Sequence, residues 1–269
     1  MTLFINISKE DLKKLKGFIP ESTKTIYEEA RLAKQGATLI LYASGKLLVQ
    51  GKKEVVAKIA SELKKLHFQE EEKTAFRKET GIIIGTDEVL KGDTFGGLVV
   101  AGVKADETTR QRLLELGVKD SKLLADKEIL LLAEKIKQIA PCEIRSLLPE
   151  EYNKEHNQTQ LLNQLHKECA EYLKPGKHIV DQFPGCTVGA VITEQAESKY
   201  VEVAAASVIA RATGLKQLNY LSALAGFDLP KGSTHVQEAL LRLFGKHVAM
   251  EKFVKMDFRN VKRVLESKN

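Results

Sequence analysis

The sequence has no tryptophan, only three cysteines and no apolar run long enough to cross a membrane. A bilayer core requires about 20 consecutive apolar residues, so the sequence predicts no membrane partner. The first residues lack the basic, apolar and small-residue order of a secretion signal, and we expect a cytoplasmic protein. Cys142, Cys169 and Cys186 are odd in number and far apart, which favours reduced thiols over a disulfide framework. His166 and Cys169 have no second ligand pair, so no zinc site is expected.

The net charge of +6 lies entirely in the first quarter of the chain. Residues 1–66 contain 13 Lys+Arg and 7 Asp+Glu, whereas the remaining 203 residues contain 29 of each sign. A basic segment beside a neutral body favours a polyanion-binding module attached to a second domain. The alternative is a Lys-rich surface that only keeps a small domain in solution.

Residue patterning divides the chain into a domain over 1–66, a polar linker over 67–80 and a larger domain over 81–269. The first domain reads as a small α+β unit, in which Ser8 and Asp11 form a capping box and Pro20 breaks the chain. Its pattern predicts a strand over 3–7, helices over 9–16, 24–34 and 54–66, and a hairpin of strands 37–42 and 46–49.

The larger domain alternates between strands and helices, which argues for an α/β fold with a mixed sheet and helices on its faces. The predicted strands cover 81–86, 97–104, 143–147, 177–180 and 188–193. The predicted helices cover 107–116, 126–139, 159–173 and a long Ala-rich stretch over 196–224, with three helical segments after the loop 228–233.

Two predicted strands end in acidic residues. The first runs into Asp87 and Glu88, and the second into Asp181. If the strands are parallel neighbours, these acids emerge at the same sheet edge, where α/β proteins place their sites. Adjacent strand residues point to opposite faces, so Asp87 and Glu88 can share a site only if the strand ends or bends there. A third acidic position, Glu197, begins the Ala-rich helix. An acidic turn and simple helix capping are the alternatives.

Clustered carboxylates repel one another, and a hard divalent cation such as Mg²⁺ relieves that repulsion through its preference for oxygen ligands. Two such ions about 3.5–4 Å apart can clamp the attacking and leaving oxygens of a phosphodiester. The acids therefore favour a metal-dependent phosphodiesterase.

Several motifs, in order, resemble bacterial ribonuclease HIII. They are 85–89 (GTDEV) with 92–93 and 95–96, the triplet 120–122 (DSK), 178–183 (HIVDQF), 196–199 (AESK) with 203–211 (VAAASVIAR), and 229–232 (LPKG). Residues 36–51 resemble the basic, TATA-binding-protein-like substrate-binding domain that precedes the nuclease in this family. The AESK context and the additional N-terminal domain point to type HIII rather than HII.

The resemblance implies a ribonuclease H-like fold and a monomer that cleaves the RNA strand of RNA–DNA hybrids, leaving 3′-hydroxyl and 5′-phosphate ends. It implies that Asp87, Glu88 and Asp181 bind Mg²⁺ or Mn²⁺ and that Glu197 completes the acidic site. It also implies that the backbone of 90–92 approaches the ribose 2′-hydroxyl. The substrate-binding residues that follow from the resemblance are Leu90, Lys91, Gly92, Lys199, Ser207 and Arg211.

The sequence departs from the family pattern near the acids. Leu90 stands where Gly is usual, and Leu disfavours the positive φ that Gly permits. Lys91 stands where a small or hydroxyl residue is common, Thr94 and Gly97 replace Tyr and Pro, and Asp257 replaces His. Two other functions stay open: a hybrid-binding protein without activity, against which the four acids argue because they would weaken binding, and a magnesium nuclease that cuts DNA junctions.

Overall fold

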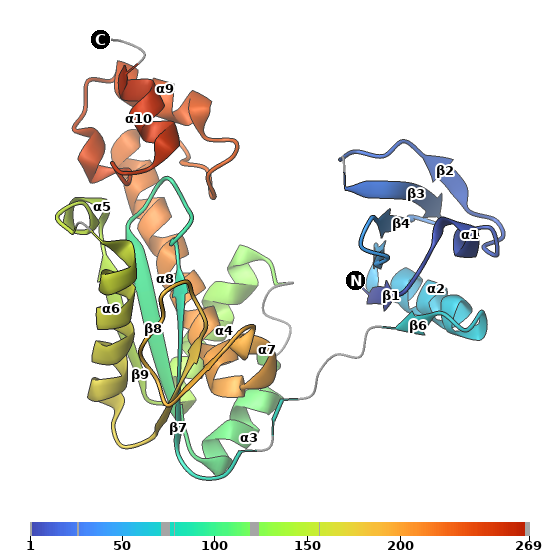
Figure 1. Ribbon diagram of the computed structural model, residues 1–269, viewed down its shortest axis with the longest axis horizontal. Helices are drawn as coiled ribbons and strands as arrows, with labels where there is room; N and C mark the ends of the chain where they lie inside the picture. The colour runs from blue at the N-terminus through green and yellow to red at the C-terminus, as the bar shows by residue number, and fades with distance from the viewer. Residues whose placement is uncertain are drawn as a thin grey trace. The chain divides into compact units, whose positions relative to one another are not determined.

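The computed structural model describes residues 2–25, 27–70, 76–77, 79–118, 124–155 and 157–266. The chain forms two compact units, Met1–Thr74 and Ala75–Asn269 (Figure 1). Each unit has its own hydrophobic core. The strand β6 (Gln69–Glu70) lies inside the stretch 67–80 that we expected to be a linker, and it pairs with β1 (Thr2–Ile5). The domain limits at 66 and 81 stay a prediction.

The N-terminal unit is an antiparallel sheet with the strand order β2-β3-β4-β5-β1-β6. Its helices α1 (Lys9–Leu12) and α2 (Lys53–Lys65) contribute side chains to one core with alternate residues of the central strands. The capping box of Ser8 and Asp11 and the predicted hairpin are confirmed, with β4 at Ala37–Tyr42 and β5 at Leu47–Gln50. The α+β composition is as expected.

The predicted helix over 24–34 is wrong. Glu28–Lys34 is the strand β3, which pairs with β4 and with β2 (Ile19–Glu21). Glu, Ala, Leu and Lys favour helices, but tertiary pairing overrides this weak preference. Gln35 and Gly36 both have positive φ and join β3 to β4, as a two-residue hairpin loop requires. Pro20 lies within β2, an edge strand, where a missing N–H is tolerated.

The second unit contains a five-stranded mixed sheet in the order β11-β10-β7-β8-β9. The strand β7 (Ile83–Val89) lies at its centre, parallel to β10 (Lys177–Asp181) and antiparallel to β8 (Leu98–Ala105). The edge strands are β9 (Cys142–Leu147) and β11 (Val191–Thr193). The predicted α/β mixed sheet is confirmed.

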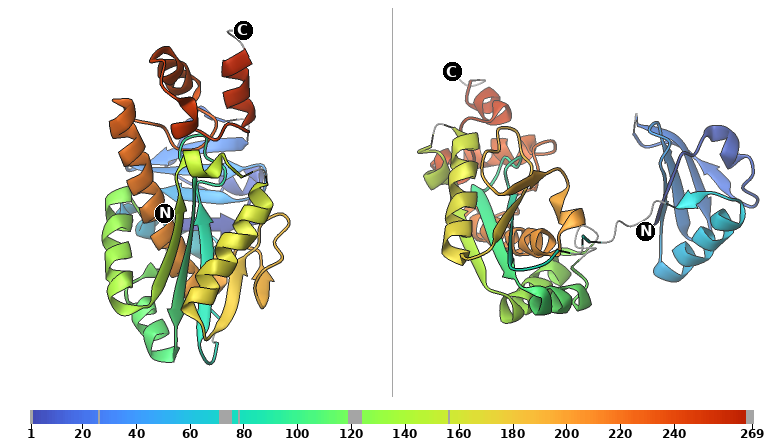
Figure 2. Two further views of the ribbon diagram at one scale, coloured as in Figure 1. Left: turned by 90° about the vertical axis from the view of Figure 1, so that its left-hand side faces the viewer. Right: turned by 60° about the horizontal axis from the view of Figure 1, so that its bottom comes forward.

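Helices cover both faces of this sheet (Figure 1, Figure 2). On one face, α8 (Val201–Ala225), α3 (Glu107–Glu115) and α4 (Asp126–Ile139) pack against alternate residues of β8 such as Val99 and Ala101. On the other face, α6 (Gln158–Leu173) packs against Leu98 and Val100. The short α5 (Pro149–Tyr152) precedes α6.

The predicted long helix over 196–224 is interrupted. Tyr200 has extended backbone angles and separates α7 (Ala196–Lys199) from α8. Its ring is buried, and its hydroxyl accepts a hydrogen bond from Arg77, which holds the break in place. Glu197 consequently lies on a separate turn rather than at the start of α8.

Three further segments complete the chain: α9 (Gln237–Gly245), the 3₁₀ turn η2 (Met250–Lys252) and α10 (Arg259–Glu266). They share a core with α8, through residues such as Leu240, Phe253 and Val261. The motif at 120–122 falls outside the described residues. Within the described ranges, no helix is both long and apolar enough to span a membrane.

Candidate active site

Two acids leave the sheet side by side. The parallel register of β7 and β10 pairs Thr86 with Val180, and the next residue on each strand is an acid, Asp87 and Asp181. The conditional expectation that both acids emerge at one edge is therefore met. Helix α8 crosses β7 closely here, because a Cβ on Gly85 would lie 2.3 Å from the backbone nitrogen of Val203. This close packing places Asp87, two residues further along β7, beside Ser207 of α8.

Asp87 has a strongly raised pKa. Burial raises its pKa to about 8, and the charges of Glu88 and Asp181 act in the same direction, while a hydrogen bond from Ser207 opposes them. The backbone N–H of Glu88 donates to Asp87 Oδ1 at 2.8 Å. Without a cation beside it, Asp87 therefore holds a proton at neutral pH.

Glu88 faces the opposite side of β7, because the strand continues through Val89 without ending at the acids. Burial acts to raise its pKa, but His166 and Lys91 outweigh burial and hold the pKa below its usual value. Lys91 Nζ donates to Glu88 Oε1, and His166 Nε2 lies 3.4 Å from Glu88 Oε2. The strand therefore neither ends between Asp87 and Glu88 nor turns both side chains to one face, but the charge of Glu88 still acts on Asp87. That the two acids share a metal site stays a prediction.

Behind Glu88 lies a buried chain of hydrogen bonds. The hydroxyl of Thr86 lies 2.8 Å from His166 Nδ1 and 2.8 Å from His178 Nε2. Burial and the charge of His166 lower the pKa of His178 to about 4, so His178 is neutral at physiological pH. A hydroxyl has one proton, so Thr86 donates to one ring and accepts from the other. If Thr86 donates to His166 Nδ1, His166 carries its proton on Nε2, which lies 3.4 Å from Glu88 Oε2 without forming a hydrogen bond there.

Asp181 and Glu197 form a second pair. The backbone N–H of Ala196 donates to Asp181 Oδ1 at 2.7 Å. Burial raises the pKa of Asp181 to about 6, and its contact with Glu197 and the charge of Glu88 act in the same direction. All four predicted acids therefore interact electrostatically at one edge of the sheet.

This arrangement fits a divalent cation. Burial and the neighbouring acids raise the pKa values of Asp87 and Asp181, so both carboxylates ionise more readily when a cation lies beside them. Glu88 Oε2 is buried and has no hydrogen-bond partner among the described residues. Within those residues, no three His, Cys, Asp or Glu side chains already converge as a complete ligand set. Mg²⁺ does not require one, since it is usually bound by one or two carboxylates together with waters and substrate phosphates.

The structure places the predicted substrate-binding segment directly after the acids. Leu90 has a φ of +67°, contrary to the preference of Leu, and its side chain is 4% exposed. Lys91 is partly exposed and ion-paired with Glu88. Gly92 is exposed, and a Cβ there would meet open space.

The other predicted substrate contacts divide between roles. Ser207 is buried and hydrogen-bonded to Asp87, so the structure joins it to the acids. Lys199 donates instead to Thr193 Oγ1 and the carbonyl of Glu194. Arg211 lines a shallow pocket with Leu90, Asp93 and Lys231.

Sequence reasoning missed four residues around the site: Thr86, His166, His178 and Lys255. Thr86 and His178 stand inside motifs that were noted for their acids, so their positions were visible but their contact was not. Lys255 lies two residues before Asp257, and its side chain is fully buried. Burial lowers the pKa of Lys255 to about 7, with the charges of Asp93 and Asp257 acting in the opposite direction.

Comparison with known proteins identifies the class. Residues 84–261 match the protein family described as Ribonuclease HII, and the chain belongs to this family. Ribonuclease HIII from Bacillus pumilus (strain SAFR-032) is 34% identical, over 96% of this chain and 97% of its own. Ribonuclease HIII from Bacillus subtilis (strain 168) is 33% identical, over 85% and 84% of the two chains.

The fold comparison agrees. The crystal structure of Bst-RNase HIII in complex with Mn²⁺ aligns with a TM-score of 0.63 at 26% identity, covering 99% of both chains. The resemblance to ribonuclease HIII is thereby confirmed over both units of the chain. The TATA-binding-protein-like character of the N-terminal unit stays a prediction.

Proposed function

We propose that this chain is an endoribonuclease that cleaves the RNA strand of RNA–DNA hybrids and leaves 3′-hydroxyl and 5′-phosphate ends. The observation that carries the proposal is the edge of the sheet where four carboxylates interact and the pKa values of Asp87 and Asp181 are raised. Membership of the ribonuclease HII family supplies the reaction class.

Asp87, Glu88 and Asp181 would hold Mg²⁺ or Mn²⁺, and the Mn²⁺ complex of the Bst relative supports this assignment. When bound, the cation activates water and stabilises charge on the phosphate. Glu197 lies against Asp181 and would complete the acidic site by orienting that carboxylate. His166 favours the ionised form of Glu88, and the hydrogen bond from Ser207 orients Asp87.

Substrate recognition would come from two places. The backbone of residues 90–92 follows the acids in the chain and would contact the ribose 2′-hydroxyl, the group that distinguishes RNA from DNA. Lys91, Lys199, Ser207 and Arg211 stay candidates for contacts with phosphate. The N-terminal unit carries the excess positive charge and would bind the hybrid backbone. We place the enzyme in the cytoplasm as a monomer.

The test is a panel of labelled RNA–DNA, DNA–DNA and RNA–RNA duplexes, titrated with Mg²⁺ and Mn²⁺ against an EDTA control. We expect cleavage of the hybrid alone, and its loss in EDTA. Asp181→Asn should abolish cleavage and leave hybrid binding intact. Asp106→Asn, at the N-cap of α3, is the matched control and should cleave normally. Hybrid binding without cleavage would favour the binding protein, and cleavage of the DNA–DNA substrate in place of the hybrid would favour the DNA nuclease.

A further inference from the structure

Residues 90–96 form a loop, here called the recognition loop, in which several carbonyl groups accept hydrogen bonds from the side chains of Lys255 and Gln158. Lys255 Nζ donates to the carbonyls of Leu90 at 2.7 Å, Asp93 at 2.6 Å and Gly96 at 3.0 Å. An ammonium group has three N–H donors and no acceptor. The three carbonyls therefore use its full donor capacity, and these bonds favour the charged form against the effect of burial.

The residues around Lys255 stabilise its buried ammonium group. Its side chain is fully buried, and Nζ lies 5.4 Å from the ring centre of Tyr152 and 5.2 Å from that of Phe258. A completely buried Lys is rare unless it is paired. Aromatic faces attract a desolvated cation. The proposed roles of the four acids do not explain why a Lys side chain is buried at this position.

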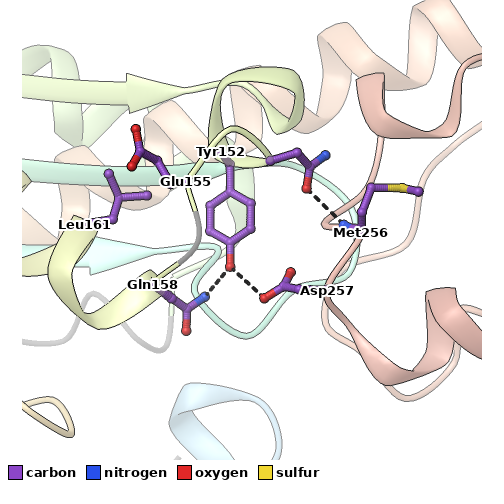
Figure 3. A pocket seen from close by; sticks show the side chains of 7 residues that line it. Tyr152, Glu155, Gln158, Leu161, Met256 and Asp257 are labelled. Atoms are coloured by element: carbon purple, nitrogen blue, oxygen red, sulfur yellow. Dashed lines mark hydrogen bonds between the residues drawn. The ribbon is translucent and has the colours of Figure 1, made fainter.

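Tyr152 and Gln158 extend the support to the next residue of the loop. Gln158 Nε2 donates to the carbonyl of Lys91 at 3.1 Å and to the hydroxyl of Tyr152 at 3.0 Å. The Tyr152 hydroxyl in turn faces Asp257 Oδ2 at 3.4 Å (Figure 3). These side chains line a cavity of about 300 Å³ beside the loop.

The backbone N–H groups of the recognition loop are not all hydrogen-bonded within the described part of the protein. Those of Asp93, Thr94 and Gly96 donate to Leu90, Gly232 and Phe253. Those of Lys91 and Gly92 donate to none of the described residues. With the carbonyls drawn inward, the loop presents these two N–H groups three and four residues after Glu88.

We propose that Lys255 is a positioning residue for RNA recognition: it ties the carbonyls of the recognition loop inward so that the N–H groups of Lys91 and Gly92 face the ribose of the substrate. The inference rests on the proposed function, because it assigns the substrate that the loop reads. It also explains how Leu90 keeps a left-handed conformation, since strained residues persist only where their surroundings over-determine them.

The experiment uses the full chain and two hybrids, one all-ribose and one with a single 2′-deoxynucleotide on the 5′ side of a mapped cleavage position. The measured quantity is the factor by which the deoxy substitution slows cleavage at that bond under single-turnover conditions. Lys255→Met removes the three donors while retaining most of the apolar stem. Lys246→Met is the matched control, because Lys246 also donates to a carbonyl, that of Ala225, and lies over Phe227.

We call the factor by which the deoxy substitution slows cleavage the deoxy factor. Lys255→Met should reduce this factor at least tenfold, because it slows cleavage of the all-ribose hybrid. Lys246→Met should leave the factor unchanged. A merely structural residue would slow both substrates equally, and that result would overturn the proposal. If Lys255→Met does not fold, as judged by circular dichroism, Gln158→Leu tests the proposal in its place. This variant removes the donor to the Lys91 carbonyl and should lower the deoxy factor. An unchanged deoxy factor would overturn the proposal. Failure of the wild type to cleave the all-ribose hybrid would refute the proposed function instead.

Discussion

In metal-free solution, Asp87→Asn should make the protein more stable at neutral pH even though it destroys the proposed metal site. Burial raises the pKa of Asp87 to about 8, while the same carboxyl in the unfolded chain keeps its ordinary value of 3.8. Between these two values the folded chain holds a proton that the unfolded chain has lost. The stabilisation from this group is therefore complete below pH 4 and is lost as the pH rises through 8.

The size of the effect follows from linkage. Each pH unit within that window lowers the free energy of unfolding by about 1.4 kcal/mol. From pH 5 to pH 7 the wild type should lose about 3 kcal/mol relative to Asp87→Asn, which has no proton to release at this position. Asp181 titrates in both proteins and largely cancels from the comparison.

The assay is urea unfolding in EDTA at several pH values, followed by far-ultraviolet circular dichroism because the chain has no Trp. The transition of the N-terminal unit, which contains none of the four acids, is the internal reference. Asp106→Asn is the control of opposite sign: hydrogen bonds from Thr109 hold the pKa of Asp106 below its usual range. That variant should lose stability relative to the wild type as the pH rises through the carboxyl range.

Parallel pH profiles for the wild type and Asp87→Asn would refute the reasoning, because they would mean that Asp87 is neither desolvated nor repelled by its neighbours. Added Mg²⁺ provides a second check. The cation favours the ionised carboxylate, so it should stabilise the wild type and flatten its pH profile, with a much smaller effect on the variant.

Three further outcomes follow from the site and the charge distribution. Thr86→Val leaves a ring nitrogen of the buried His166 and one of the half-buried His178 without their partner, so the free energy of unfolding should fall by roughly 2–4 kcal/mol; an unchanged urea midpoint would contradict the hydrogen-bonded chain. Lys91→Gln removes the ammonium group that competes for Glu88, and calorimetry should show Mg²⁺ binding about two- to fivefold tighter; equal affinity would mean that the ion pair does not oppose the metal. Removal of residues 1–74 should raise KM and reduce the slope of log affinity against log salt by about 0.7–0.9 for each phosphate that the N-terminal unit neutralises; an unchanged slope would exclude this unit from substrate binding.

The acidic edge could be predicted because its determinants are local. Apolar runs that end in Asp87 and Asp181 identify strand ends, and parallel pairing brings such ends together. What could not be predicted is the face on which Glu88 lies. Its partner His166 comes from α6, 78 positions away in the numbering of the chain, and no local pattern links the two.

The errors in secondary structure have the same origin. Residues 28–34 carry helix-favouring side chains, and only their pairing with β2 and β4 makes them a strand. The one local signal was Gln35-Gly36, a two-residue hairpin loop. Tyr200 interrupts the Ala-rich stretch because its ring is buried and its hydroxyl meets Arg77. Helical periodicity alone does not register such a contact.

Leu90 shows how tertiary contacts decide a conformation that residue type disfavours. A left-handed backbone costs a non-Gly residue about 1–2 kcal/mol, whereas complete burial of a Leu side chain contributes about 1.5–3 kcal/mol. The Leu90 side chain packs beside Gly96, where an added Cβ would lie 2.9 Å from Leu90 Cδ1. The bond from Lys255 to the Leu90 carbonyl then joins positions 165 residues apart. Leu therefore does not disqualify this position from the geometry that Gly usually supplies, because the fold provides the stabilisation that the residue lacks.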